Sequence, residues 1–193
     1  MSKGGDFERE ICKKLSRWLS KNSDDNILWR CDSSGARFTI NRKKGNEILS
    51  QAGDITYRKE EGKKFIERFC IELKTGYGRK NTKKKEMIRW DILDILDSKQ
   101  SRPIFKIFWD QVYKKSLEVK KSPLLIFRRN NRNALICMKE NTFFKINNKI
   151  ENYIIINDNH NNKLIIFSLK DFLEKVDPDS FINHWELFSL FSK

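Results

Sequence analysis

One short stretch, residues 69–76, constrains the fold most, because apolar and charged side chains alternate along it. This alternation is typical of a β-strand and places Glu72 and Lys74 on the same face. The opposite face is apolar and consists of Phe69, Ile71 and Leu73. For this stretch alone, the simpler interpretation is a strand whose apolar face meets the core, while Glu72 and Lys74 are solvated or paired with each other.

A second short stretch upstream, residues 51–57, changes that interpretation. It also has the pattern of a strand, and Asp54 follows Gly53 directly near its beginning. Two neighbouring strands can bring Asp54 and Glu72 together at one end of a sheet. The region between residues 57 and 62 is charged, and we expect it to be a hairpin connection that completes a compact antiparallel sheet.

The charge of the chain indicates its class of partner. The 193 residues include 40 Lys and Arg against 26 Asp and Glu, which gives a net charge of +14 and a pI near 9.7. Such a balance favours a polyanionic partner, and nucleic acid above all, although basic proteins that contact acidic surfaces share it. With 38% hydrophobic residues, we expect one domain spanning residues 1–193.

The sequence predicts neither a membrane segment nor export. A membrane helix needs about 20 consecutive apolar residues, and no run here approaches that length. Residues 1–7 lack the apolar segment of a secretory signal. We therefore expect a soluble, cytoplasmic protein without a membrane partner.

Cysteine and histidine usage argues against a zinc site. No Cys-x-x-Cys spacing occurs, and scattered cysteines in apolar stretches are typical of buried thiols in a reducing compartment. The four positions are Cys12, Cys31, Cys70 and Cys137. His160 and His184 lie far apart without a paired ligand motif, which also excludes nucleases built on a histidine and metal pair.

Residues 6–20 have the periodicity of an amphipathic helix. Glu8 falls inside its apolar stripe, and a carboxylate there needs a partner. Two interpretations remain open: a salt bridge to one of the many basic residues, or a carboxylate directed at a metal ion or its water.

The remaining elements alternate between strands and helices. Besides the two strands above, the patterns predict strands at residues 27–30, 123–128, 134–138, 153–157 and 164–167, and helices at 85–99, at 102–117 and from Ser168 onwards. On the helix at 102–117, Gln111 lies at the edge of the apolar face and Asp110 points away. The apolar residues at 177–193 predict a segment that caps the core or forms a dimer contact.

Several basic segments are candidates for phosphate contacts, among them the turn at residues 129–133 with its arginines. Small residues beside an arginine, as at 33–37, suit close approach to a phosphate, although an ordinary surface turn explains them equally well. The loops at 41–45 and 75–85 are more strongly basic, and such runs are otherwise solvated. The candidate contacts are Arg30, Ser34, Arg37, Lys43, Lys44, Arg79, Lys80, Lys83 and Lys84.

Several of these residues together resemble a known superfamily. They are Gly53-Asp54 on one strand, Glu72-Leu73-Lys74 on the next, Glu8 in the first helix and Gln111 in a later one. Their order resembles the PD-(D/E)xK nucleases, and with Arg30 and Ser34-Gly35 it is similar to the Holliday junction resolvase-like branch. Residues 108–111 followed by 123–127 are similar to small phage or mobile-element endonucleases. Gly53 departs from the motif, because it stands where the family name has proline.

The resemblance implies an α/β, restriction-endonuclease-like core, in which helices flank a central mixed sheet in the order αβββαβ. It implies metal-dependent hydrolysis of phosphodiesters in DNA, with Asp54, Glu72 and the Leu73 carbonyl as oxygen ligands of Mg²⁺ or Mn²⁺. Lys74 would orient the attacking water and stabilise developing charge. By the same resemblance, Gln111 would position Lys74 or the scissile phosphate. Glu8 would hold a metal-bound water or a second ion.

The choice of substrate remains open at this stage. We expect branched DNA and a homodimer, as in Holliday junction resolvases, while a restriction-type or nicking enzyme acting on duplex DNA would use the same core. A non-catalytic nucleic-acid-binding protein with structural acid pairs is the alternative from another class. A structural or interaction protein would leave the charge of +14 unexplained.

Overall fold

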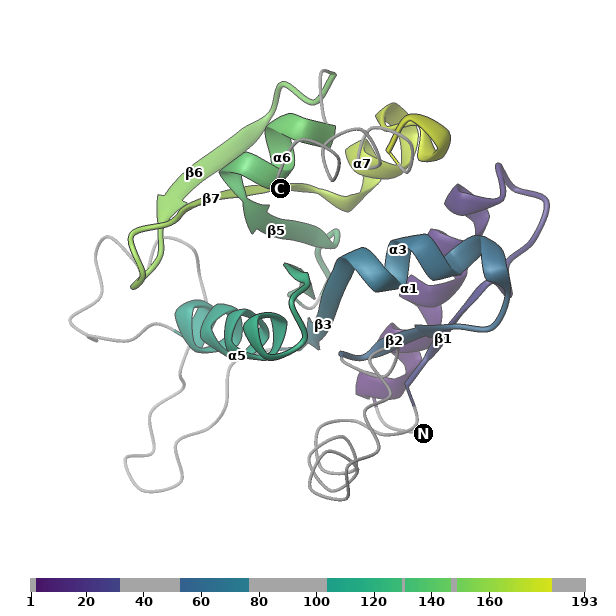
Figure 1. The fold of residues 1–193 in the computed structure, drawn as a ribbon, viewed down its shortest axis with the longest axis horizontal. Helices are drawn as coiled ribbons and strands as arrows, with labels where there is room; N and C mark the ends of the chain where they lie inside the picture. Colours follow the sequence, from purple (N-terminus) through teal and green to yellow (C-terminus); the bar gives the residue numbers. More distant parts are fainter. Residues whose placement is uncertain (1–2, 32–52, 77–103, 130, 147–148, 182–193) are drawn as a thin grey trace.

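The fold is given by a computed structural model, which describes residues 3–31, 53–76, 104–129, 131–146 and 149–181 (Figure 1). In chain order the elements are α1 (Lys3–Leu19), β1 (Leu28–Arg30), β2 (Ile55–Tyr57), the 3-10 helix η2 (Glu60–Gly62), α3 (Lys63–Arg68), β3 (Phe69–Thr75), α5 (Ile104–Glu118), β4 (Ser122–Arg128), β5 (Leu135–Lys139), α6 (Glu140–Ile146), β6 (Tyr153–Asn157), β7 (Lys163–Ser168) and α7 (Leu169–Lys175). Apart from the short helices η2 and α3, the first elements follow the predicted order αβββαβ.

A five-stranded mixed sheet forms the centre of the fold. Its strand order is β3-β4-β5-β7-β6. The β3–β4 pair is parallel, and the other pairs are antiparallel. The predicted α/β fold with a central mixed sheet is therefore confirmed. A parallel pair needs a long crossover, and α5 lies within the crossover from β3 to β4.

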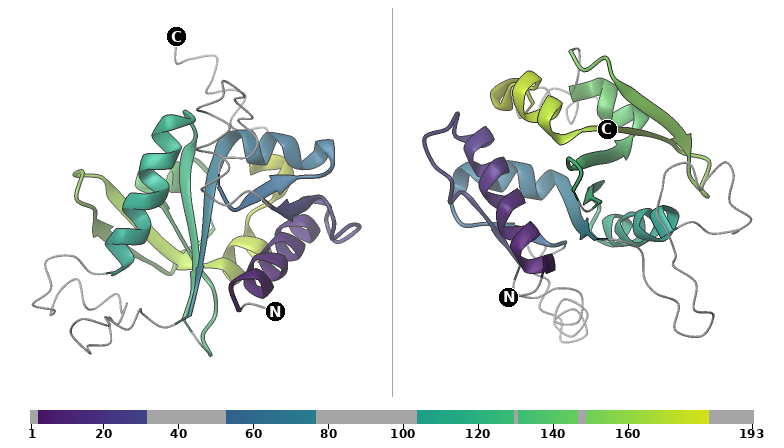
Figure 2. Two further views of the ribbon diagram at one scale, coloured as in Figure 1. Left: turned by 90° about the horizontal axis from the view of Figure 1, so that it is seen from below. Right: turned by 180° about the vertical axis from the view of Figure 1, so that it is seen from behind.

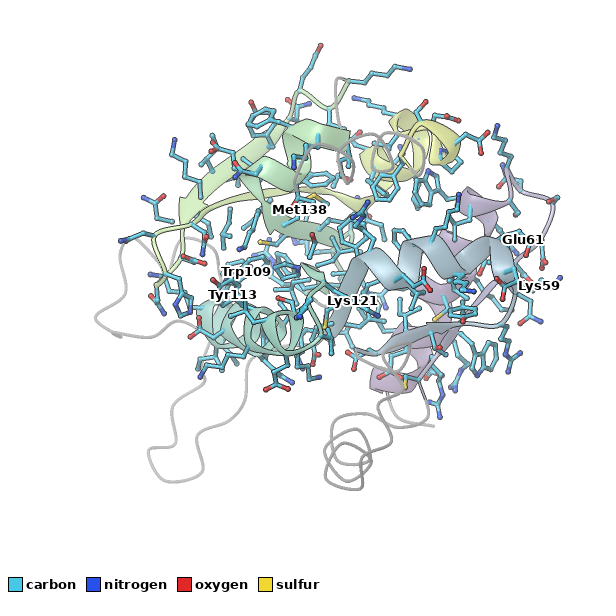
Figure 3. All side chains as sticks on the ribbon, viewed as in Figure 1. Lys59, Glu61, Trp109, Tyr113, Lys121 and Met138 are labelled. Carbon is cyan, nitrogen blue, oxygen red and sulfur yellow. The ribbon has the colours of Figure 1, made fainter. Side chains whose placement is uncertain are left out.

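Helices cover both faces of this sheet. Among the described helices, α5 is the one that packs against one face, where its side chains share a core with Leu125, Cys137 and Ile166 of three strands. Helices α1, α3, α6 and α7 lie on the other face, which carries Ile126 and Phe167. Figure 2 (left) shows the sheet between α5 and α1, and Trp109 of α5 lies between its helix and the sheet (Figure 3).

The alternation predicted for β3 is present. Phe69, Ile71 and Leu73 contribute to the core beneath α1, whereas Cys70 contributes to the core beneath α5. Glu72 is on the α5 face and is only 2% exposed. The simpler interpretation of the strand alone had Glu72 and Lys74 either solvated or paired with each other. The solvated Glu72 is therefore wrong, whereas the pairing with Lys74 is present, at 2.6 Å.

The region between β2 and β3 differs from the expected hairpin. β1 and β2 pair in antiparallel fashion, but η2 and α3 separate β2 from β3, and the bridge between Gly53 and Ile71 is parallel. Burial of Phe65 and Ile66 explains the helix, because both side chains pack in the main core. The longer crossover allows the parallel approach, whereas a hairpin would have imposed an antiparallel one.

The C-terminal half follows the predicted strands closely but contains one additional helix. The Ser168 hydroxyl caps α7, as expected, by accepting hydrogen bonds from two backbone N–H groups. Helix α6 was not predicted. It is stabilised by burial of Phe143, whose ring centroid lies 4.9 Å from that of Phe167. Phe181 is buried against Trp18 and Phe172. The predicted helix at 85–99 and residues 182–193 lie outside the described residues.

All four cysteines are among the described residues, and they are buried and not joined by disulfides. This confirms the expectation of buried thiols. Within the described stretches, no helix has both the length and the apolar character needed to cross a membrane.

Candidate active site

Asp54 is attached to the edge of β3 by two hydrogen bonds. Its backbone N–H donates to the Ile71 carbonyl at 2.8 Å, and its carboxylate Oδ2 accepts from the Leu73 N–H at 2.7 Å. Because Glu72 lies between these two residues on β3, the structure brings the Asp54 and Glu72 side chains to the same place. The two strands therefore meet where the sequence predicted a pair of acids.

Gly53 permits this close approach between the two backbones. Its φ of +107° lies in the left-handed region, and a Cβ would be 2.6 Å from the Ile71 carbonyl oxygen. That oxygen belongs to the strand itself, so it cannot move aside. Proline, with φ fixed at about −65°, cannot adopt this conformation either. The glycine at the motif's first position therefore reflects the local backbone of this chain.

Three donors surround the buried carboxylate of Glu72. The Lys74 ammonium lies 2.6 Å from Oε1, and the Gln111 side-chain amide donates to the same oxygen at 2.8 Å. The Lys115 ammonium lies 2.7 Å from the other oxygen, Oε2. Such charge-assisted hydrogen bonds compensate a buried carboxylate for the loss of its hydration. The structure thus joins Glu72, Lys74 and Gln111, as the resemblance implied, and adds Lys115.

Helix α5 supplies two of these donors from one face. Gln111 and Lys115 are four residues apart and therefore lie one above the other on a helix. Asp110, which we expected to point away from the apolar face, is nevertheless buried, at 6% exposed. Its Oδ1 lies 3.5 Å from Nε2 of His160, in the turn between β6 and β7. That turn packs against α5 and buries a helix position that the apolar pattern alone leaves outside.

Burial and the neighbouring Glu72 charge raise the pKa of Asp54 from 3.8 to about 6. The Leu73 N–H, Lys115 and Lys74 act in the opposite direction without cancelling this effect. The two carboxylates therefore lie close enough for the charge of Glu72 to disfavour ionisation of Asp54.

Lys115 remains an ammonium group in this environment. Burial lowers the pKa of Lys115, but the negative charges of Glu72 and Asp54 outweigh this effect. The pKa is therefore above its ordinary value. Lys74 also lies near an aromatic ring, with its Nζ 5.4 Å from the Phe108 centroid. Lys115 is thus held as a cation beside the acidic pair, and Lys74 lies between Glu72 and this ring.

The donor set fits a hard divalent cation. Asp54 and Glu72 offer carboxylate oxygens, which Mg²⁺ and Mn²⁺ prefer as ligands, and the two side chains lie close enough for the charge of Glu72 to act on Asp54. Among the described residues, no group of three or more histidine, cysteine, aspartate or glutamate side chains could hold a metal ion. Any ion here would therefore need further ligands, such as backbone carbonyls or water.

Glu8 lies near the acidic pair but has its own partner. Its carboxylate is 3.8 Å from the Arg30 guanidinium, and its side chain is 29% exposed. Burial raises the pKa of Cys12 to about 12, and the charges of Glu8 and Asp54 add to this effect, so both carboxylates lie close to that thiol. The salt bridge was one of the two interpretations open for Glu8, and it is the arrangement in the structure.

Arg30 is the predicted DNA contact that the structure describes, and its partner is Glu8. The other predicted contacts lie outside the described residues: Ser34, Arg37, Lys43, Lys44, Arg79, Lys80, Lys83 and Lys84.

Sequence reasoning missed Lys115. The signal was present, because Gln111 was already a candidate on a predicted helix and a lysine four residues later shares its face. What the sequence lacked was the direction in which that helix faces the sheet.

Comparison with known proteins places the chain in a family. Searches of the curated proteins and of the solved structures gave no match. A family model does match, over residues 1–183, and its description is "Phage putative PDDEXK endonuclease". This range includes both strands of the acidic pair and the helix that carries Gln111 and Lys115. The chain therefore belongs to this phage-type PD-(D/E)xK endonuclease family.

Proposed function

We propose that this protein is a metal-dependent DNA endonuclease whose active site consists of Asp54, Glu72 and Lys74. One observation carries the proposal: the buried Glu72 carboxylate lies beside Asp54 and is bonded by the Lys74 ammonium at 2.6 Å. Acids and an amine on two adjoining strands are what phosphodiester hydrolysis requires, because the reaction develops negative charge and needs an activated water.

Asp54, Glu72 and the Leu73 carbonyl are the residues that would hold Mg²⁺ or Mn²⁺. When bound, such an ion neutralises charge on the phosphate oxygens and makes a coordinated water more acidic. The hydrogen bond from the Leu73 N–H fixes the Asp54 carboxylate in place, so its orientation does not depend on the ligand. Ligands held by the sheet in this way need little reorganisation during the reaction.

Lys74 and Gln111 have distinct roles in this proposal. Lys74 orients the attacking water and stabilises the negative charge that develops on the phosphate. Gln111 holds Oε1 of Glu72 from α5 and thereby positions both the acid and the lysine bonded to the same oxygen. Glu8 is paired with Arg30. We still predict that the Glu8 carboxylate leaves this pair and contacts a metal-bound water.

Branched DNA is the substrate we propose within this class, cut by a homodimer that places two sites on opposing strands. The charge of +14 supports a nucleic-acid substrate that is held largely through its phosphates. In this proposal residues 1–193 form one nuclease domain, and residues 177–193 cap it or contribute to the dimer. The cytoplasmic location stays a prediction.

Cleavage of a labelled four-way junction tests the proposal, with linear duplex, flap and single-stranded DNA as controls. We expect paired, symmetric cuts in the junction with Mg²⁺ and none with EDTA or in Glu72→Gln. The matched control is Glu151→Gln, the same substitution at an exposed site before β6. Cutting of duplex or flap instead would retain the nuclease and discard the preference for junctions.

One observation favours a second candidate, a non-catalytic nucleic-acid-binding protein. Both oxygens of Glu72 already have partners, as they would in a purely structural cluster. Such a protein would bind DNA equally well with and without a divalent cation, and would cut none of the substrates above. A direct measurement of cation binding therefore separates the two candidates.

A further inference from the structure

Lys115 differs from the other donors on Glu72 in the oxygen that it contacts. Lys74 and Gln111 both bond Oε1, at 2.6 and 2.8 Å. Lys115 bonds Oε2 at 2.7 Å. The carboxylate thus has one oxygen held by the strand's own lysine and the helix amide, and one oxygen held by a lysine from the helix. Release of Lys115 alone would free Oε2 and leave Oε1 in place.

The position of Lys115 is set by the packing of α5. Its side chain is 23% exposed, beside a Glu72 side chain that is 2% exposed. The neighbouring helix residues Val112 and Ser116 are buried against the sheet, so the backbone that carries Lys115 cannot shift freely. Lys114, the residue directly before Lys115 on the helix, is exposed to solvent. Two adjacent lysines therefore differ in whether they face the acidic pair.

We propose that Lys115 is an internal counterion for Glu72, which competes with a divalent cation for the carboxylate oxygen Oε2. The inference rests on the metal site of the proposed function and concerns how that site is regulated by the chain itself. In the absence of an ion, the ammonium neutralises a buried acid beside Asp54. When an ion is to be bound, Oε2 must exchange its ammonium partner for the ion, since a hard cation needs the oxygen's lone pair.

The competition has a direction that can be measured. A charge-assisted hydrogen bond is among the stronger ones in proteins, and breaking it weakens cation binding by the corresponding amount. Removal of the ammonium should therefore tighten the binding of a cation. If Lys115 instead oriented Glu72 for the ion, its removal would weaken that binding.

Calorimetric titration with Mn²⁺ in the absence of DNA tests the proposal, using wild type, Lys115→Met and Lys114→Met. We expect the Kd for Mn²⁺ to fall by about ten-fold or more in Lys115→Met, the factor that corresponds to loss of one such bond. Lys114→Met, which makes the same change of charge and shape one residue away, should stay close to wild type because an exposed charge is screened.

Lys115→Gln provides a second variant in case Lys115→Met does not fold. It keeps a hydrogen-bond donor but removes the charge, so we again expect tighter binding of Mn²⁺, while Lys115→Arg, which keeps the charge, should bind like wild type. In EDTA, both neutral variants should melt at a lower temperature than wild type, and Mn²⁺ should raise their melting temperature by more.

Unchanged or weaker binding of Mn²⁺ in the neutral variants would overturn the inference and leave the proposed metal site intact. Equal tightening in Lys114→Met would also overturn it, since the effect would then reflect overall charge. A wild-type protein that binds no Mn²⁺ would overturn both the inference and the metal-dependent function. The outcomes for the two proposals are therefore distinct.

Discussion

Helix α5 contacts two buried acids, and they are satisfied in opposite ways. Asp158, in the turn between β6 and β7, accepts hydrogen bonds from the Trp109 indole, the Asn162 side chain and two backbone N–H groups. Glu72 is bonded by two ammonium groups and one amide. The first acid has neutral donors held by the fold, and the second has cations at the ends of long side chains.

The surroundings of Asp158 and those of Asp54, the neighbour of Glu72, have opposite effects on acidity. Burial raises the pKa of Asp158, but the hydrogen bonds from Asn162, Trp109 and His160 outweigh this effect. The pKa is therefore below its ordinary value. Burial and the charge of Glu72 instead raise the pKa of Asp54 to about 6. Asp158 is thus stabilised as a carboxylate by the hydrogen bonds of the fold, whereas ionisation of Asp54 is disfavoured by burial and by the charge of Glu72. This difference, more than burial itself, distinguishes the candidate site from a structural hydrogen-bond network.

The largest expected effect concerns activity. Glu72→Gln should reduce DNA cleavage by roughly 10³-fold, because it removes a ligand charge and the partner of Lys74. Asp158→Asn should leave the rate per folded molecule nearly unchanged. Single-turnover cleavage with Mg²⁺ measures both. Comparable losses in the two variants would abolish the distinction between the acids.

The next largest effect concerns stability. Asp158→Ala leaves the Trp109 indole and two backbone N–H groups without their acceptor, so we expect a loss of about 3 kcal/mol in the free energy of unfolding. Urea unfolding measures it. Glu151→Ala, at an exposed position before β6, is the control and should change stability by less than about 0.5 kcal/mol.

Asp54→Asn should raise the free energy of unfolding, whereas Asp158→Ala lowers it. The folded-state pKa of Asp54 is raised, so its contribution to stability is fully present below about pH 3.8 and is lost as the pH rises through about 6. Without divalent ions, Asp54→Asn should therefore stabilise the protein by about 3 kcal/mol at pH 7.5 and by about half as much at pH 5. The amide oxygen can still accept from the Leu73 N–H. Urea unfolding at both pH values, in EDTA, measures the effect, and a destabilised variant at pH 7.5 would contradict it.

The smallest effect is expected for Trp109→Phe. It removes one of several donors to Asp158 while keeping an aromatic ring in the core, so we expect a loss of about 1 kcal/mol in the free energy of unfolding. Cleavage should not change. A drop in activity without a drop in stability would show that the turn at Asp158 influences the site through α5.

The sequence was sufficient for features that depend on local pattern. The alternation of β3 placed Glu72 and Lys74 on one face, and the glycine before Asp54 marked the second strand. It was insufficient where tertiary packing decides. Helices α3 and α6 form because Phe65 and Phe143 find buried positions in the core, which no local periodicity shows over so few residues.

The orientation of α5 was the other gap. The apolar pattern located the helix, but the burial of Asp110 and the approach of Lys115 to Glu72 depend on which sheet face it covers and on the β6–β7 turn that packs against it. The roles of Glu8 and the basic loops depend on a bound partner, and they stay predictions.

The hydrogen bonds from α5 to Glu72 also have a consequence for when the site can exist. They join residues 39 and 43 positions apart in the chain, and contacts over such separations form only after the loop between them has closed. A chain still emerging from the ribosome has β3 long before it has Gln111 and Lys115. We therefore expect the site to be among the later parts of the molecule to assemble, so that a chain synthesised only as far as β3 lacks two of the three donors that hold Glu72.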